Sequence, residues 1–282
     1  MTIKEALEKG TIQLKVKNIE TPKMKARLLM QYVLDKPRQY LLVHDKEDIT
    51  DIQKDKYFKS IEKLIQGIPL QHITHQQEFM KMSFYVNKNV LIPRADTEIL
   101  VEEVMEIARK INAKKILDLC TGSGAIAISL AKYLANSEIT AIDISEKALE
   151  IANKNAKKNE VENQIKFIKS NLFENISNQK FDIIVSNPPY IKKEVIRTLD
   201  EEVKKEPIIA LDGGIDGLDF YRKIINEAYN YIKYKGYLCL EIGFDQKEEV
   251  IELINKKGNY VHTYSKKDLY DKDRIVITKV GD

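Results

Sequence analysis

The chain has 282 residues, and its 46 Lys and Arg residues against 43 Asp and Glu residues leave a formal net charge of only +3. This balance does not indicate a polyanion-binding surface. The two cysteines, Cys120 and Cys239, lack the spacing of a disulfide framework or a zinc site. Because the N-terminus is charged and no apolar run approaches the ~20 residues that span a bilayer, we expect a cytoplasmic protein without a metal or a membrane anchor.

Residues 1–75 are predicted to form a small helical domain, since they show no strand-like alternation. Thr21 can cap and Pro22 can begin a helix whose apolar side chains share one face. These side chains are Ala26, Leu29, Tyr32 and Val33. A further helix is predicted by the apolar spacing over residues 57–65.

Residues 76–92 are predicted to be a β-hairpin that connects this domain to the rest of the chain. The sequence over 78–92 alternates apolar and polar residues, and Asn87-Lys88-Asn89 is a turn signal. We therefore expect the hairpin to reverse at these three residues.

Residues 93–282 are predicted to form an α/β domain, whose first helix should have Asp96 or Thr97 as its N-cap. Strands are expected at 115–119, 138–143, 165–169, 181–186, 237–243, 260–265 and 274–280. Strands that alternate with helices form a parallel sheet covered on both faces, and the fourth strand should lie beside the first. The stretch between the last two strands is too short for a crossover helix, so these two should form an antiparallel pair at one edge.

A glycine-containing turn follows the first of these strands. In DLCTGSGAIAIS, Gly122 and Gly124 let the backbone approach a ligand, and the free N–H groups of the following helix face it. Asp143 ends the second strand, where a carboxylate can accept both hydroxyls of a ribose. The pattern predicts a nucleotide-shaped cofactor, although a glycine turn and a helix-capping Asp could also bind nothing.

Asp118 indicates which cofactor this is. The two glycines with Ala127 also fit the relaxed dinucleotide pattern G-x-G-x-x-A. An acid just before the glycines suits a cation better than a pyrophosphate, and S-adenosylmethionine carries an ammonium and a sulfonium group. After the third strand, Asn171 could hydrogen-bond an adenine, while Leu172 and Phe173 are either apolar walls of the site or core residues.

The strand at 181–186 ends in Asn187-Pro188-Pro189-Tyr190. The prolines remove backbone donors and stiffen the turn. The Asn187 side-chain oxygen and the Pro188 carbonyl can then both accept hydrogen bonds from one NH2 group, and Tyr190 can stack on the flat group that carries it. A lone Asn-Pro would be only a turn, but this element beside a glycine loop predicts a site for a planar amide or amine.

The nitrogen of such a group is a poor nucleophile because its lone pair is delocalised. Two acceptors that hold its hydrogens would align the nitrogen with the methyl group of a sulfonium and stabilise the positive charge that develops during attack. A strong general base is not needed, since the nitrogen becomes acidic only after methylation. The motif therefore predicts N-methyl transfer.

Longer segments resemble the HemK-type release factor glutamine methyltransferases, which share Asn-Pro-Pro-Tyr with the N6-adenine methyltransferases. The matches run in order over nearly the whole chain: GIPLQHIT (67–74), VLIPRADTEILV (90–101), DLCTGSGAIAI (118–128), SNPPYI (186–191), KEPIIALDGGIDGLDFYR (205–222) and LEIGFDQ (240–246). The resemblance implies a helical substrate-recognition domain followed by a Rossmann-like, seven-stranded class I methyltransferase domain. It also implies methylation of the glutamine in the Gly-Gly-Gln loop of bacterial class 1 peptide chain release factors.

The resemblance further implies roles for individual residues. The residues that line the S-adenosylmethionine site would be Cys120, Thr121, Gly122, Ser123, Gly124, Asp143, Leu172 and Asn187. Catalysis would rest on Asn187 and Pro188, and the substrate amide would be held by Asn187, Pro188, Pro189 and Tyr190. The chain departs from the family pattern at Ala95-Asp96, which replaces Pro-Glu, at Asn171, which replaces Asp, and at His72 and His75, which replace Tyr and Gly.

Other functions fit these residues less well. An adenine N6 methyltransferase on DNA or RNA would want a basic groove or a recognition domain, so direct nucleic acid binding is not expected. A noncatalytic S-adenosylmethionine-binding adaptor would not need an intact Asn187. A nicotinamide oxidoreductase would need a hydride-site partner, and none is evident. The DGGIDGLD segment is predicted to be either a plain glycine turn or a loop that closes the crevice, and His72 with His75 does not predict a metal site.

Overall fold

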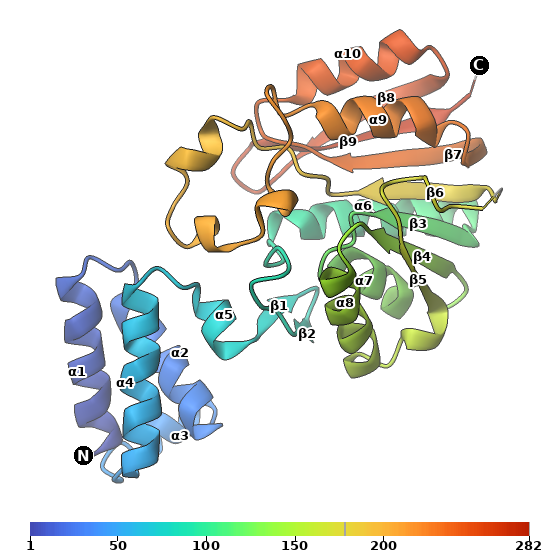
Figure 1. Cartoon of the computed structure of the whole chain (residues 1–282). Coiled ribbons are helices and arrows are strands. Elements are labelled where there is room, and N and C mark those ends of the chain that lie inside the picture. Colours follow the sequence, from blue (N-terminus) through green and yellow to red (C-terminus); the bar gives the residue numbers. More distant parts are fainter. Residues whose placement is uncertain (178, 282) are drawn as a thin grey trace. The chain divides into compact units, whose positions relative to one another are not determined.

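The computed structural model describes residues 1–177 and 179–281, which fall into two compact units (Figure 1). One unit comprises Met1–His75 with Asp200–Lys205, and the other comprises Gln76–Leu199 with the residues from Glu206 onward. Within these described ranges, no helix has both the length and the apolar character needed to cross a membrane.

The first unit is helical. It contains α1 (Ile3–Val16), α2 (Pro22–Leu34), α3 (Arg38–Val43), α4 (Asp51–Ile65), α5 (Leu70–Thr74) and the short 3-10 helix η3 (Val203–Lys205). Thr2 and Thr50 begin α1 and α4 with capping boxes, in which the threonine hydroxyl and a side chain three residues later satisfy free backbone N–H groups. The largest core side chains are Leu14, Leu29, Met30, Tyr57, Ile61 and Leu64. Burial of each contributes about 1.5–3 kcal/mol.

The helix predicted to start at Pro22 is confirmed, but its predicted cap is wrong. α2 begins at Pro22 and buries Ala26, Leu29 and Val33 on one face, as the spacing predicts. Thr21 occupies the N-cap position with a left-handed φ of 48°, and its side chain makes no capping hydrogen bond within the described structure. Capping side chains usually start from extended backbone, which Thr21 does not adopt.

The second unit begins with a hairpin of β1 (Gln77–Phe79) and β2 (Met82–Phe84). The two turn residues, Met80 and Lys81, have left-handed φ values of 49° and 59°. A two-residue turn with positive φ at both positions matches the twist of the flanking strands. The hairpin is thus much shorter than the sequence predicts.

The prediction that this hairpin reverses at Asn87-Lys88-Asn89 is wrong. These residues form a separate turn, in which the Asn87 side-chain oxygen accepts the N–H of Asn89 at 2.9 Å. Just before it, the N–H and carbonyl of Tyr85 are both bonded to the side chain of Asn155 on α8 (Glu146–Lys158). A side chain of α8 thereby hydrogen-bonds the backbone N–H and carbonyl of Tyr85 that a strand partner would need.

Seven strands form a sheet in the order β5-β4-β3-β6-β7-β9-β8. They are β3 (Lys115–Leu119), β4 (Glu138–Asp143), β5 (Ile165–Lys169), β6 (Phe181–Ser186), β7 (Ile232–Glu241), β8 (Tyr260–Lys267) and β9 (Asp273–Val280). β3 to β7 are parallel, and β9 runs antiparallel to both β7 and β8. The predicted α/β class, the adjacency of β6 to β3 and the antiparallel edge pair are confirmed, whereas β7 starts earlier than predicted.

Helices cover both faces of this sheet (Figure 1). One face packs on α6 (Asp96–Ile111), α7 (Ala125–Tyr133) and part of α8, and the other packs on α9 (Asp219–Ala228) and α10 (Lys247–Lys257). Short 3-10 helices are η1 (Glu162–Gln164), η2 (Val195–Thr198) and η4 (Ile208–Ala210). Successive strand residues alternate between the two cores, as Ile116 and Leu117 do.

The N-cap predicted for α6 is also wrong. The helix begins at Asp96, and Ala95 takes the N-cap position. The two side chains proposed as caps contact other groups instead. Asp96 forms an ion pair with Arg274 at 3.1 Å, and the Thr97 hydroxyl oxygen accepts a hydrogen bond from Asn187 at 3.2 Å. The contact of Thr97 connects the start of α6 with the crevice described below.

Candidate active site

A crevice opens where β3, β4, β5 and β6 end. Its lining residues are Asn89, Val90, Leu91, Cys120, Gly122, Ile142, Asp143, Ile144, Ser145, Ala148, Ser170, Asn171, Leu172, Asn187, Pro189, Pro207, Ile209, Ala210 and Phe220. Because β6 pairs with β3, the glycine turn and the Asn-Pro-Pro-Tyr element meet here, as the sequence predicts. The predicted site residues in this lining are Cys120, Gly122, Asp143, Leu172, Asn187 and Pro189.

The two glycines of the turn have different roles. A Cβ built on Gly122 would have no described atom within 4 Å, so glycine there leaves open space in the crevice. A Cβ on Gly124 would lie 2.8 Å from Ile128 and 3.1 Å from Ala152. Gly124, at φ 82°, thus lets the start of α7 pack closely against α8. It does not line the crevice, and neither do the buried residues Thr121 and Ser123.

Asp143 is held rigidly at the end of β4. Its Oδ2 accepts the Gly122 N–H at 2.9 Å and its Oδ1 accepts the Ser145 N–H at 2.8 Å. Burial raises the pKa of Asp143, while these N–H groups act to lower it. Each carboxylate oxygen keeps a lone pair that can accept a further hydroxyl.

Asp118 lies beneath the crevice and not in its wall. It is fully buried on β3, and its Oδ2 accepts the hydroxyl proton of Thr121 at 2.6 Å. Its Oδ1 has no hydrogen-bond partner among the residues that the structure describes. Burial raises the pKa of Asp118 to about 7. A buried carboxylate with one unpaired oxygen favours a cation in the crevice above it. Asp118 itself is not among the described residues that line the crevice.

Asn187 stands at the tip of β6. The preceding Ser186 donates its hydroxyl to the Leu119 carbonyl at 2.9 Å, which links the ends of β6 and β3. The Asn187 Nδ2 donates to the Thr97 hydroxyl oxygen at 3.2 Å. The other arm of the same planar carboxamide, Oδ1, is then the acceptor that a ligand in the crevice can use.

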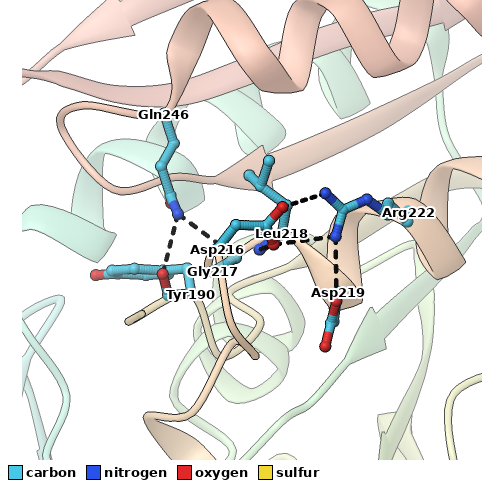
Figure 2. Close-up of polar contacts among 7 residues, drawn as sticks. All are labelled: Tyr190, Asp216, Gly217, Leu218, Asp219, Arg222 and Gln246. Carbon is cyan, nitrogen blue, oxygen red and sulfur yellow. Dashed lines mark hydrogen bonds and ion pairs between the residues drawn. The ribbon is translucent and has the colours of Figure 1, made fainter. Parts of the chain in front are cut away.

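Tyr190, the last residue of the Asn-Pro-Pro-Tyr element, is fixed by two hydrogen bonds. Its hydroxyl donates to Oε1 of Glu241 at 3.3 Å, and its carbonyl accepts a hydrogen bond from Gln246 Nε2 at 3.0 Å (Figure 2). Tyr190 and Pro188 are not among the described residues that line the crevice. The stacking of Tyr190 on a substrate stays a prediction.

The DGGIDGLD loop, residues 212–219, packs on the backbone that follows the motif. Gln246 donates to the carbonyls of Tyr190 at 3.0 Å and Gly217 at 3.2 Å (Figure 2). A Cβ on Gly213 would lie 2.7 Å from the Tyr190 Cα, and one on Gly217 would lie 2.5 Å from the Tyr190 carbonyl oxygen. The loop therefore supports the Asn-Pro-Pro-Tyr backbone, which neither sequence interpretation of this segment anticipated.

Arg222 on α9 stabilises the far side of the same loop. It is paired with Asp216 and, at 3.1 Å, with Asp219, as Figure 2 shows. Asp216 also accepts the Leu218 N–H at 3.1 Å. Gly217 lies between Asp216 and Leu218 in the chain. The contacts of these two residues therefore restrict the position of Gly217, which lies against Tyr190.

The segment after β5 contributes only part of what the sequence predicts. Asn171 and Leu172 line the crevice. Phe173 is 2% exposed and stacks on Tyr231 with ring centroids 4.7 Å apart. Phe173 is thus a core residue, and its interpretation as a wall of the site is wrong.

Cys120 lines the crevice but is not a reactive thiolate. Burial raises the pKa of its thiol well above the ordinary range. Among the described residues, no group of three or more His, Cys, Asp or Glu side chains could hold a metal ion. The raised pKa of its thiol disfavours Cys120 as a nucleophile.

Several residues at the site were not predicted from the sequence. The unassigned lining residues include Asn89, Val90 and Leu91 before α6, and Pro207, Ile209, Ala210 and Phe220 around η4. The only signal for them was that they lie within or beside the segments VLIPRADTEILV and KEPIIALDGGIDGLDFYR. Thr97, Glu241 and Gln246 lie in the matching segments 90–101 and 240–246, but their contacts at the site were not predicted because their partners are far away in the sequence.

The fold and crevice define a class I S-adenosylmethionine-dependent methyltransferase. Residues 94–206 match the family model for the methyltransferase small domain, and residues 5–74 match that for the PrmC N-terminal domain. A methyltransferase from Pyrococcus furiosus has the same fold, with a TM-score of 0.51 at 18% identity over 83% of this chain and 100% of that one.

Two curated relatives are similar over their whole length. The release factor glutamine methyltransferase of Clostridium acetobutylicum is 41% identical over 100% of this chain and 99% of the relative. The protein of the same name from Clostridium botulinum is 40% identical over 98% of each. The chain belongs to the release factor glutamine methyltransferase family.

The loop support can be tested with a pair of glycine variants. Gly217→Ala should destabilise the protein by about 2–4 kcal/mol and lower kcat roughly tenfold or more, because its Cβ must displace Tyr190 or the loop. Gly258→Ala is the matched control: Gly258 also has a left-handed φ, 73°, but no described atom lies within 4 Å of its Cβ position. Urea unfolding and methyl-transfer kinetics measure both effects. Equal losses in the two variants would contradict the assigned role of the loop.

Asp118→Asn should stabilise the cofactor-free protein at pH 8 by about 1–3 kcal/mol. The native pKa near 7 exceeds the ordinary value of 3.8, so the native state retains a proton that the unfolded state releases. Wild-type stability therefore falls as pH rises through this interval, whereas Asn cannot ionise. Urea unfolding from pH 4 to 8 should show a difference between the two proteins that grows with pH. A constant difference would show that Asp118 titrates normally.

Proposed function

We propose that this methyltransferase transfers the methyl group of S-adenosylmethionine to the side-chain amide nitrogen of the glutamine in the Gly-Gly-Gln loop of bacterial class 1 release factors. The position of Asn187 is the observation that supports this proposal most directly. Its carboxamide lines the same crevice as Gly122 and Asp143, and its Nδ2 donates a hydrogen bond to Thr97. The names of the two clostridial relatives support the choice of substrate. The reaction belongs to translation termination and therefore to the cytoplasm.

S-adenosylmethionine would bind in this crevice. Asp143 would accept the ribose hydroxyls with the lone pairs that Gly122 and Ser145 leave free. Leu172 would form an apolar wall, while Cys120 and Gly122 would lie along the ligand. The residues that do not line the crevice, Thr121, Ser123 and Gly124, would act by shaping the turn. S-adenosylmethionine supplies a methyl group on a positively charged sulfur.

The substrate amide would be held by two oxygens. Asn187 Oδ1 and the carbonyl of the next residue, Pro188, would accept the two hydrogens of the glutamine NH2 group. Asn187 and Pro189 line the crevice, whereas Pro188, between them in the chain, is not among the described lining residues. Holding both hydrogens directs the nitrogen lone pair towards the methyl group and stabilises the charge that develops on nitrogen. The product nitrogen then loses a proton to solvent, so the site needs no strong base.

Asn187→Ala should lower kcat about 100-fold or more while S-adenosylmethionine binds nearly as well, since it removes a contact that strengthens in the transition state. The measurement is transfer of radiolabelled methyl to a release factor, to its Gln→Ala loop variant and to duplex DNA. Label should appear only on the intact factor. Asn171→Ala, at another crevice-lining Asn, is the control and should change the KM for the cofactor more than kcat. Label on the loop variant or on DNA would overturn the proposed substrate.

We also propose a division of labour, with substrate recognition in residues 1–75, a connector at 76–92 and methyl transfer in 93–282. A glutamine side chain offers too few atoms to select one protein, so other surfaces must recognise the release factor. The helical unit has a groove that suits this role. It is lined by Leu7, Glu8, Thr11, Ile12, Lys23, Arg27, Arg38, Leu41 and Leu42.

The groove can be tested without removing the helical unit. Ile12→Glu combined with Leu42→Glu should lower kcat/KM for the intact release factor about tenfold, because charge on exposed apolar contacts costs binding energy. The rate on a short peptide that contains only the Gly-Gly-Gln loop should not change. Ile52→Glu is the control, since Ile52 is exposed on α4 and does not line the groove. Unchanged kinetics on the intact factor would remove the groove from recognition.

A further inference from the structure

Thr97 is buried, at 4% exposure, in the first turn of α6. Its hydroxyl oxygen lies 3.2 Å from Asn187 Nδ2 and accepts that hydrogen bond. The contact joins residues 90 positions apart and reaches the one side chain that the reaction depends on most. This contact therefore affects whether Oδ1 or Nδ2 of Asn187 faces the substrate.

Glu241 lies next to this contact at the end of β7 and is 1% exposed. Its Oε1 accepts the Tyr190 hydroxyl at 3.3 Å, whereas its Oε2 has no hydrogen-bond partner in the described part of the chain. Burial raises the pKa of Glu241 to about 7, while the hydroxyl of Thr97 and the charge of Arg274 lower it. The carboxylate thus has a spare acceptor, and the Thr97 side chain lies near enough to Glu241 to lower its pKa.

We propose that Thr97 is a positioning residue that fixes the rotation of the Asn187 carboxamide, and that Glu241 fixes the Thr97 hydroxyl in turn. This inference rests on the proposed function and deepens it. Neither Thr97 nor Glu241 lines the crevice in the described structure. Both act through Asn187.

The physical reason lies in the symmetry of a carboxamide. Half a turn of the Asn187 side chain exchanges Oδ1 and Nδ2 with little change in shape. In the reversed position an NH2 group would face the NH2 group of the substrate, and two donors repel. A free Thr97 hydroxyl could not prevent this, because a hydroxyl can either donate to Oδ1 or accept from Nδ2.

Glu241 removes that ambiguity. A hydroxyl has a single proton, and Glu241, once ionised above its pKa of about 7, can only accept. Once the Thr97 proton is directed at Glu241, the hydroxyl can offer Asn187 only an acceptor. Nδ2 must then face Thr97, and Oδ1 must face the crevice. The same carboxylate also holds the Tyr190 hydroxyl, so it fixes both ends of the motif.

Thr97→Val keeps the shape of the side chain and removes the hydroxyl. It should lower kcat about tenfold, the effect of one lost hydrogen bond, and leave the KM for S-adenosylmethionine unchanged. Thr97→Ser keeps the hydroxyl and should retain most of the activity. Thr278→Val, at a buried hydroxyl paired with Thr263 on β8, is the control for general destabilisation. A fully active Thr97→Val enzyme would overturn the inference.

A double-mutant cycle separates positioning from a purely structural role. If Thr97 acts only through Asn187, Thr97→Val should have no further effect on kcat in an Asn187→Ala background. The same tenfold loss in both backgrounds would contradict the inference. The cycle also keeps the two proposals apart. An active Asn187→Ala enzyme would end the proposed function, whereas a severe Asn187→Ala defect with a fully active Thr97→Val enzyme would end only this inference.

Discussion

The parallel pairing of β6 with β3 is the constraint on which the rest of the site depends. Leu119 lies opposite Ser186, and the Ser186 hydroxyl donates to the Leu119 carbonyl, so the two strands stop side by side. The glycine turn leaves from one strand and Asn187 leaves from the other. A register slip of one residue would turn the side chains of β6 to the opposite face of the sheet and separate the two halves of the crevice.

Two further sets of contacts make the tip of β6 rigid. The first acts on its backbone: residues 212–219 and Gln246 hold the carbonyl of Tyr190 (Figure 2). The second acts on side chains, since Thr97 holds Asn187 and Glu241 holds Tyr190. Positioning supplies much of the rate in a reaction without a general base, so we expect the contacts of Asn187 to contribute to the rate of the proposed reaction.

The sequence predicted the sheet well and these supports poorly, for physical reasons. Short apolar runs between turn residues define β3 to β6, because a strand buried on both faces needs such a run. The hairpin turn was misplaced because Asn87 and Asn89 are a local signal, and a contact from Asn155 outweighs it. Phe173 could not be told from Leu172 by composition, since both are buried in the same core and only Leu172 also lines the crevice, while Phe173 stacks on Tyr231. Gln246 and Thr97 lie in segments that resemble the family, but no local pattern predicts their contacts with Tyr190 and Asn187.

The most direct test of the central claim is a crystal structure with S-adenosylhomocysteine and a glutamine-containing peptide from the Gly-Gly-Gln loop. We expect Asn187 Oδ1 and the Pro188 carbonyl both to lie about 3 Å from the glutamine amide nitrogen, with the cofactor sulfur on the opposite side of that nitrogen. An amide nitrogen that contacts neither oxygen, or a peptide bound outside the crevice, would contradict it.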